Sequence, residues 1–193
     1  MNESPTLHVI QGGPSPLVVI GSVDIFVGND STNPQFSIDV RLVEEDTWQV
    51  LSADSSARVI DEHPIRLMTG LIDQKPLSVG DVLANGSRWQ AVTMDFDQQP
   101  VCRADWLTLT LEHVLQKVEE KGAHSISLPL LGVNHGDISC DISVALFIDA
   151  IKAFRFSSAC RIWLVVPVDC LAMVKQRLLA AAWPAYLTRL RDI

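Results

Sequence analysis

Hydrophobic and polar residues change their spacing about halfway along the chain. Up to residue 97 the apolar positions form β-branched runs or alternate with polar ones, which is typical of strands. After Pro100 they recur every three or four residues in some segments and form short unbroken runs in others, as in helices that alternate with buried strands. The pattern predicts a strand-rich first half and an α-β-α-β-α second half.

Turn-forming residues divide the first half into short strands. The predicted strands are 7–13, 17–27, 36–43, 48–51, 65–68, 79–83 and 89–96. We expect 36–43 and 48–51 to pair as a hairpin. Asn85-Gly86 predicts a second hairpin, of type I′, between the last two strands.

The second half predicts three helices and two central strands. The first helix starts at Asp105 as N-cap and ends at Gly122, and the strand 124–131 follows it. A second, strongly apolar helix covers 138–154, and a strand covers 161–168. Asp169 is expected to cap a third helix with Leu171, Val174, Leu178 and Leu179 as its core stripe, interrupted at Pro184. Short connections predict parallel strands with helices on both faces of a mixed sheet, in a single domain over 1–193.

The loop 132–137 separates a buried strand from a helix, which is the geometry of an anion site. Gly132 and Gly136 allow backbone N–H groups to turn towards a ligand, and Asn134 and His135 are candidate donors. Asp137 is expected to cap the following helix. The alternative interpretation is an ordinary strand-to-helix turn with a solvated histidine.

Two further groups of polar residues are candidates. Asn29 and Asp30 follow a predicted central strand, where open α/β sheets bind ligands, although turn formation explains them equally well. Asp95 and Asp97 alternate with Phe96, which we expect to enter the core. With His135 and Asp137 they would form an acid/base or metal cluster, the alternative being solvated carboxylates.

Composition limits the classes of partner. The 193 residues are 48% hydrophobic and 20% charged, with a net charge of −8, and these values indicate a globular chain without a nucleic-acid partner. We find no signal sequence and no apolar run long enough for a membrane span, so we expect a cytoplasmic protein. The four cysteines lack metal-site spacing and are expected to be reduced, mostly buried thiols, with neither a metal nor a cofactor.

The text of the loop resembles the macro domain, the ADP-ribose-binding family. SISLPLLGVNHG (125–136) is similar to the family's strand and phosphate-binding loop, LHVIQGG (7–13) to its opening strand, and VDIFVGND (23–30) to its "VDAIVNAAN" strand. The resemblance implies a three-layer α/β/α fold with a largely parallel mixed sheet. Residues 34–77 would be a strand-rich insertion in place of the family's Gly-rich loop and helix. The N-terminal domain of leucine aminopeptidases shares this fold without the ADP-ribose function, so the fold alone does not assign an activity.

Three hypotheses follow. The first is binding of a small anionic nucleotide, related to ADP-ribose, at Gly132, Val133, Asn134, His135 and Gly136 with Asn29 and Asp30 opposite. The second is an interaction or assembly module without a ligand, such as a homo-oligomer, because the insertion would create an exposed strand edge. The third is a hydrolase that uses Asp95, Asp97 and His135.

Overall fold

The computed structural model describes residues 15–51 and 75–191, with side chains as far as Ala182. The strands are β1 (Val18–Ile20), β2 (Val23–Gly28), β3 (Val40–Asp46), β4 (Val82–Asn85), β5 (Arg88–Met94), β6 (Ser125–Pro129) and β7 (Cys160–Val165). The helices are α2 (Ala104–Lys121), α3 (Cys140–Ala153) and α4 (Leu171–Arg191), with the short 3-10 helix η2 (Val168–Cys170) before α4. The predicted strands 7–13 and 65–68 lie outside the described residues.

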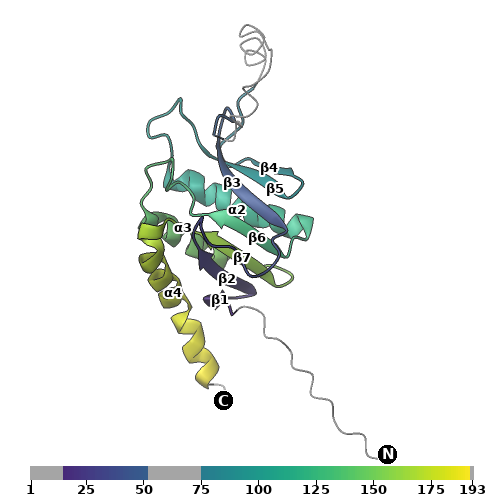
Figure 1. The fold of residues 1–193 in the computed structure, drawn as a ribbon, viewed down its shortest axis with the longest axis vertical. Helices are drawn as coiled ribbons and strands as arrows, with labels where there is room; N and C mark the ends of the chain where they lie inside the picture. Colours follow the sequence, from purple (N-terminus) through teal and green to yellow (C-terminus); the bar gives the residue numbers. More distant parts are fainter. Residues whose placement is uncertain (1–14, 52–74, 192–193) are drawn as a thin grey trace, which may run out of the picture.

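The strands form one mixed sheet in the order β1-β2-β7-β6-β3-β5-β4 (Figure 1). The five inner strands run parallel, and β1 and β4 pair antiparallel with β2 and β5 at the two edges. The connections β5-α2-β6-α3-β7 place helices between parallel strands, as the change of hydrophobic spacing predicted. The predicted α/β class with a largely parallel mixed sheet is confirmed.

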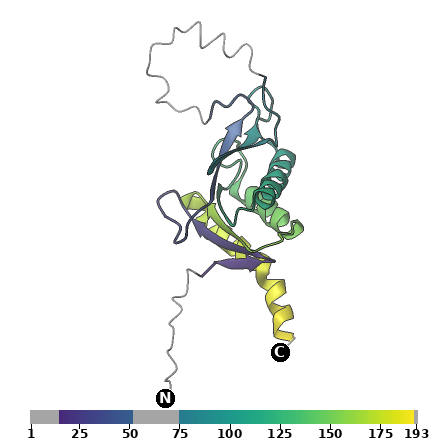
Figure 2. The same cartoon turned by 90° about the vertical axis from the view of Figure 1, so that its right-hand side faces the viewer.

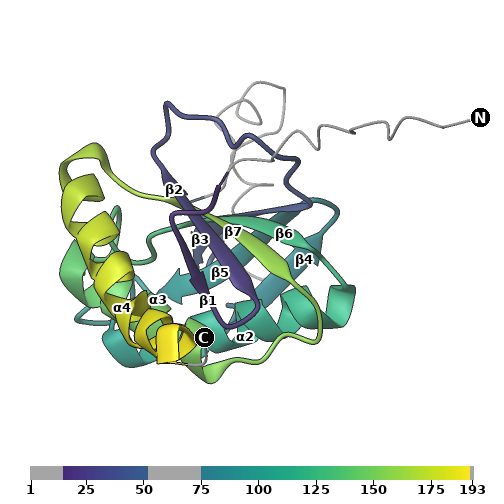
Figure 3. The ribbon, with the colours of Figure 1, turned by 90° about the horizontal axis from the view of Figure 1, so that it is seen from below.

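The sequence predicted helices on both faces of the sheet, but the helices of the described ranges flank one side, and the segment 29–39 lies on the other (Figures 2 and 3). In β7, Ile162 and Leu164 are fully buried towards the helices, whereas Arg161 on the opposite face is exposed. Between sheet and helices lies one core to which every described α-helix contributes, with Leu111, Val118, Phe147, Ile151, Val174 and Leu178 among its members. We call the opposite side the open face.

The structure corrects the predicted pairing of β3. Residues 48–51 do not form a strand, and β3 instead lies inside the sheet, parallel to both β5 and β6. Residues 40–46 are therefore part of the central sheet, although they belong to the range 34–77 that we expected to be an insertion. The remainder of that range includes 52–74, which lies outside the described residues.

The second predicted hairpin is confirmed with a different turn. Asn85 pairs with Arg88, so the tip consists of Gly86 and Ser87. Of these residues Gly86 alone has a positive φ, of 54°, whereas a type I′ turn requires two. The assignment of type I′ to Asn85-Gly86 was wrong.

Helices α2 and α4 differ from the sequence prediction in three respects. Gly122 ends α2 in the left-handed conformation as predicted, but Arg103 rather than Asp105 is the N-cap. In α4 the helix continues through Pro184 to Arg191 without the predicted interruption. Leu179 is 49% exposed, so the core stripe of α4 consists of Val174 and Leu178 with Leu171 at its margin.

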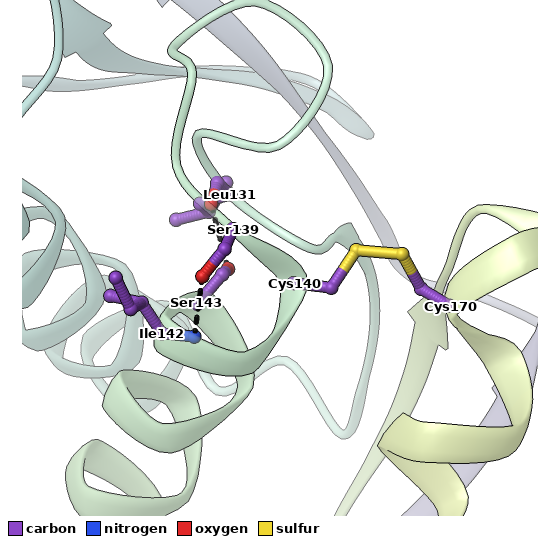
Figure 4. Close-up of a disulfide and its surroundings, with 6 residues drawn as sticks. All are labelled: Leu131, Ser139, Cys140, Ile142, Ser143 and Cys170. Carbon is purple, nitrogen blue, oxygen red and sulfur yellow. Dashed lines mark hydrogen bonds between the residues drawn. A yellow bond between two sulfur atoms is a disulfide. The ribbon is translucent and has the colours of Figure 1, made fainter.

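We predicted that all four cysteines are reduced thiols, and the structure contradicts this for two of them. Cys140, at the start of α3, forms a disulfide with Cys170 in η2 (Figure 4). Cys102 and Cys160 are free and buried. Burial raises the pKa of Cys102 to about 11 and that of Cys160 to about 12, so both thiols stay protonated at neutral pH and are poor nucleophiles.

No helix of the described part is long and apolar enough to cross a membrane. Cytoplasmic location stays a prediction, and the disulfide removes the reduced cysteines from its support.

Candidate functional site

The loop between β6 and α3 forms a single turn closed by its own backbone. The N–H groups of Gly136 and Ile138 both donate to the carbonyl oxygen of Gly132, each over 3.1 Å. The amides of Val133, Asn134 and His135 have no hydrogen-bond partner among the residues that the structure describes. Successive unpaired amides in a closed turn leave N–H groups available to an anion, as in the first turn of a helix.

The two glycines of the loop are also required by packing. Gly132 has a φ of 77°, and a Cβ atom on it would lie 2.8 Å from a methyl carbon of Leu107. A Cβ atom on Gly136 would lie 2.6 Å from that of Cys102. Both glycines are buried, so the structural interpretation of the pair is sufficient, and any ligand must be contacted by the residues between them.

Asp137 does not cap α3, contrary to the prediction. Its φ is 55°, and the N-cap is Ser139, whose Oγ accepts a hydrogen bond from the Ile142 amide over 3.3 Å (Figure 4). Ser143 then donates from its hydroxyl to the Leu131 carbonyl over 2.7 Å and ties the helix back to the start of the loop. The start of α3 is therefore held at three points: a serine cap, a serine hydrogen bond and the disulfide.

A pocket of about 330 Å³ lies beside the loop. Its lining residues are Asp30, Leu42, Val43, Glu44, Leu51, Arg88, Ser127, Pro129, Asn134, His135 and Val165. The pocket crosses the sheet from the end of β2 to the start of β5, over the open face. Among the predicted ligand-binding residues, the structure brings Asp30, Asn134 and His135 together here, whereas Gly132, Val133, Gly136 and Asn29 do not line it.

Asn29 faces a second pocket, of about 560 Å³, which Phe26, Trp163 and Lys175 also line. Its own groups are engaged in a local turn. The Asn29 amide donates to Thr32 Oγ1 over 2.7 Å, and its Oδ1 accepts from the Ser31 amide over 2.9 Å. Turn formation, the alternative stated from the sequence, accounts for Asn29.

Glu44 is a site residue that the sequence analysis missed. It extends from β3 towards the helix side of the sheet, is 8% exposed, and accepts hydrogen bonds from the Gly132 amide over 2.5 Å and from Thr93 Oγ1 over 3.4 Å. Burial raises the pKa of this carboxyl, and the bond to Gly132, the charge of His135 and the bond to Thr93 partly counteract the rise. The sequence signal was the Glu-Glu-Asp run at the end of an apolar strand, which falls between the two strands of the hairpin predicted for 36–43 and 48–51 and so counted as its turn.

Asp95 and Asp97 serve the turn that follows β5. Asp95 accepts hydrogen bonds from the Asp97 amide over 3.0 Å and from Gln98 Nε2 over 2.7 Å, and Asp97 accepts from Trp48 Nε1 over 2.9 Å. Phe96 is 45% exposed, so the prediction that its ring enters the core was wrong. In 15–51 and 75–191, no group of three or more His, Cys, Asp or Glu side chains could hold a metal ion. These contacts give the hydrolase hypothesis no support.

No protein-family model matches the chain, and no curated protein does. Solved structures do. A single-residue variant of the Oceanobacillus iheyensis macrodomain with ADPR matches with a TM-score of 0.58 and 17% identity over 86% of this chain and 94% of that one. The macro domain of ganglioside induced differentiation associated protein 2 matches with a TM-score of 0.55 and 12% identity over 84% of each chain.

The macrodomain of Thermus aquaticus DarG matches with a TM-score of 0.50 and 17% identity, over 76% of this chain and 99% of that one. At these identities the likeness establishes the architecture and leaves ligand and activity open. With the mixed seven-stranded sheet and its flanking helices, the matches show that this chain has a macro domain-like fold.

Proposed function

We propose that the protein binds a small anionic nucleotide of the ADP-ribose class in the pocket beside the loop 132–136. One observation carries the proposal. Asn134 and His135 meet Asp30 from the end of β2 around a pocket at the carboxyl ends of parallel strands, where open α/β sheets bind ligands.

The loop supplies the groups for a phosphate. The unpaired amides of residues 133–135 and the side chains of Asn134 and His135 are hydrogen-bond donors at one edge of the pocket. The buried carboxylate of Glu44 holds the Gly132 amide from the other side of the turn and fixes the loop before a ligand arrives. Such preorganisation lowers the entropy that binding would otherwise cost.

The end of the pocket beside β2 suits hydroxyl groups. Asp30 is acidic and exposed, and a carboxylate there accepts hydrogen bonds from a ribose while it repels a second phosphate. Neighbouring structures support this ligand class, because the Oceanobacillus iheyensis macrodomain has been solved with ADPR and with ADP.

Isothermal titration with ADP-ribose, ADP, AMP and adenosine tests the proposal. We expect the phosphorylated compounds to bind and adenosine to bind at least tenfold more weakly. Adenosine lacks the phosphate that the loop donors would hydrogen-bond, and a loss of about 1.4 kcal/mol in binding free energy raises the Kd tenfold. If none of the four compounds gave a heat of binding, the proposal would be contradicted and the assembly hypothesis would remain. Light scattering of the intact chain would then test that hypothesis.

A charge variant locates the site. Asn134→Asp places a carboxylate at the phosphate position and should weaken ADP-ribose binding by about tenfold or more, because like charges repel across a short distance. The matched control is Asn85→Asp, since Asn85 is also exposed but lies at the far edge strand β4. Equal affinities of the two variants would place the ligand elsewhere.

Gly132 is a poor target for this purpose. Its φ of 77° and its contact with Leu107 mean that any side chain would disturb folding as well as binding.

A further inference from the structure

Two arginines lie side by side on the open face. Arg41 of β3 is in register with Arg88 of β5, and it is also in register with Ser127 of β6. Their chain neighbours Leu42 and Trp89 are buried on the helix side, at 4% and 3% exposure, so the alternation of a strand directs both arginines to the open face. Both are exposed.

Neither guanidinium is neutralised. In the described part of the chain, the ion pairs involve Arg103, Lys117 and Arg177, and no hydrogen bond reaches the side chain of Arg41 or Arg88. Like charges opposite each other on neighbouring strands are unfavourable, and this pair stands in a chain of net charge −8. The pair therefore forms a local positive field that an anion would relieve.

Arg88 belongs to the pocket of the proposed function. It lines the end farthest from Asp30, with Ser127 between it and the loop. The Ser127 hydroxyl has no partner among the described residues. Two strand spacings, about 10 Å, separate Arg88 from Ser127 of β6, and Ser127 lies two residues, about 7 Å, before the end of that strand, where the loop follows. One ligand extended over more than about 12 Å can therefore contact both the loop and the arginine.

We propose that Arg88, assisted by Arg41, forms a second anion subsite, and that the preferred ligand carries a phosphate monoester separate from its diphosphate. Arginine suits this group because its planar fork binds phosphate oxygens in pairs. The pocket then has an acidic end for hydroxyl groups, donors in the middle for the diphosphate, and a basic end for the additional phosphate. This inference rests on the proposed function and specifies its substrate class.

The test compares ADP-ribose with ADP-ribose 2′-phosphate, which differ by one phosphate on the adenosine ribose. For the unmodified chain, titration calorimetry should show at least about tenfold tighter binding of the phosphorylated compound, a typical gain for a charge-assisted bidentate contact. Arg88→Gln should remove this gain, so that the variant binds the two compounds with affinities within about twofold of each other. Arg41→Gln should reduce it in part.

The matched control is Arg161→Gln. Arg161 is an exposed arginine on the same face, but it packs over the ring of Phe36 and does not line the pocket, so its variant should keep the full gain. Thermal melting of each variant checks the fold, and Arg88→Gln should melt no lower than the unmodified chain because a like-charge neighbour has been removed.

Equal affinity for the two compounds, or a gain that survives Arg88→Gln, would overturn the subsite and leave the proposed function intact. Absence of binding by both compounds would overturn the proposed function and the subsite with it.

Discussion

The two faces of the sheet differ in what their side chains contact. On the helix face, β7 presents Ile162 and Leu164, both fully buried, and the polar groups there, such as Glu44, have hydrogen-bond partners. On the open face, β3, β5 and β6 present Arg41, Arg88 and Ser127, whose side-chain polar groups have no hydrogen-bond partner among the described residues. The difference indicates that the helix face holds the fold together, whereas the proposed binding pocket lies over the open face.

Truncation of a helix-face side chain should give the largest effect. Phe147→Ala on α3 removes a ring that is 2% exposed, and we expect a loss of about 3–5 kcal/mol in the free energy of unfolding. The matched change on the open face, Val43→Ala, affects a half-buried side chain and should cost about 1 kcal/mol. Chemical denaturation measures both, and similar losses would break the distinction between the faces.

Loss of the disulfide should give the next largest effect. The bridge closes a loop across 30 residues, so Cys140→Ser should lower the free energy of unfolding by about 3 kcal/mol. Reductant should destabilise the unmodified chain and have no effect on the variant. An unmodified chain that is insensitive to reductant would show that the bridge does not contribute.

The pH dependence of stability should reveal Glu44, with a smaller effect. Because burial raises its pKa in the folded state, Glu44 contributes stability when protonated, below its ordinary pKa, and loses that contribution as the pH rises through the raised value. Glu44→Gln keeps an acceptor for the Gly132 amide and removes the charge. Its stability relative to the unmodified chain should therefore increase from acid to neutral pH.

The control for this measurement is Glu112→Gln, at an exposed position on α2. The same pH profile for both glutamine variants would contradict the role of burial at Glu44.

Two serines provide the finest comparison. Ser143→Ala removes a buried hydroxyl that donates to the Leu131 carbonyl and should cost about 1 kcal/mol. Ser127→Ala removes the unpaired hydroxyl on the open face and should change stability by less than about 0.5 kcal/mol. A larger cost at Ser127 would mean that the open face also supports the fold.

The local patterns of the sequence predicted most of the second half. Strong apolar periodicity located α2, β6, α3 and β7, and Gly122 located the end of α2. The ends of helices were harder to predict where two nearby residues could both serve as the N-cap. Asp137 and Ser139 are both good N-caps, and only the left-handed backbone at Asp137 decides for Ser139.

Long-range relations were not predictable from those patterns. The apolar alternation of β3 is the same whether its partner is the next segment in the chain or β6, so the hairpin with 48–51 was wrong. Cys140 and Cys170 have no sequence spacing that marks a bridge, and only the packing of α4, which η2 precedes, against α3 brings them within 6.3 Å between Cα atoms.

The residues of the candidate site divide in the same way: those marked by a local pattern were predicted, and those that depend on strand pairing were not. The loop, with Asn134 and His135, was found because its residues are consecutive, and Asp30 because it follows a central strand. Glu44 and Arg88 reach the site from β3 and β5, and their roles depend on strand order and register.

The strand order also affects how the chain folds as it leaves the ribosome. Strands β3, β4 and β5 can pair once Met94 has been synthesised, but β2 has its inner partner only in β7, which begins at Cys160. During most of synthesis the hairpin of β1 and β2 therefore has an unpaired inner edge, a template for pairing with other chains. A chain that ends before Cys160 would keep that edge permanently, so premature termination should yield aggregates rather than a smaller folded unit.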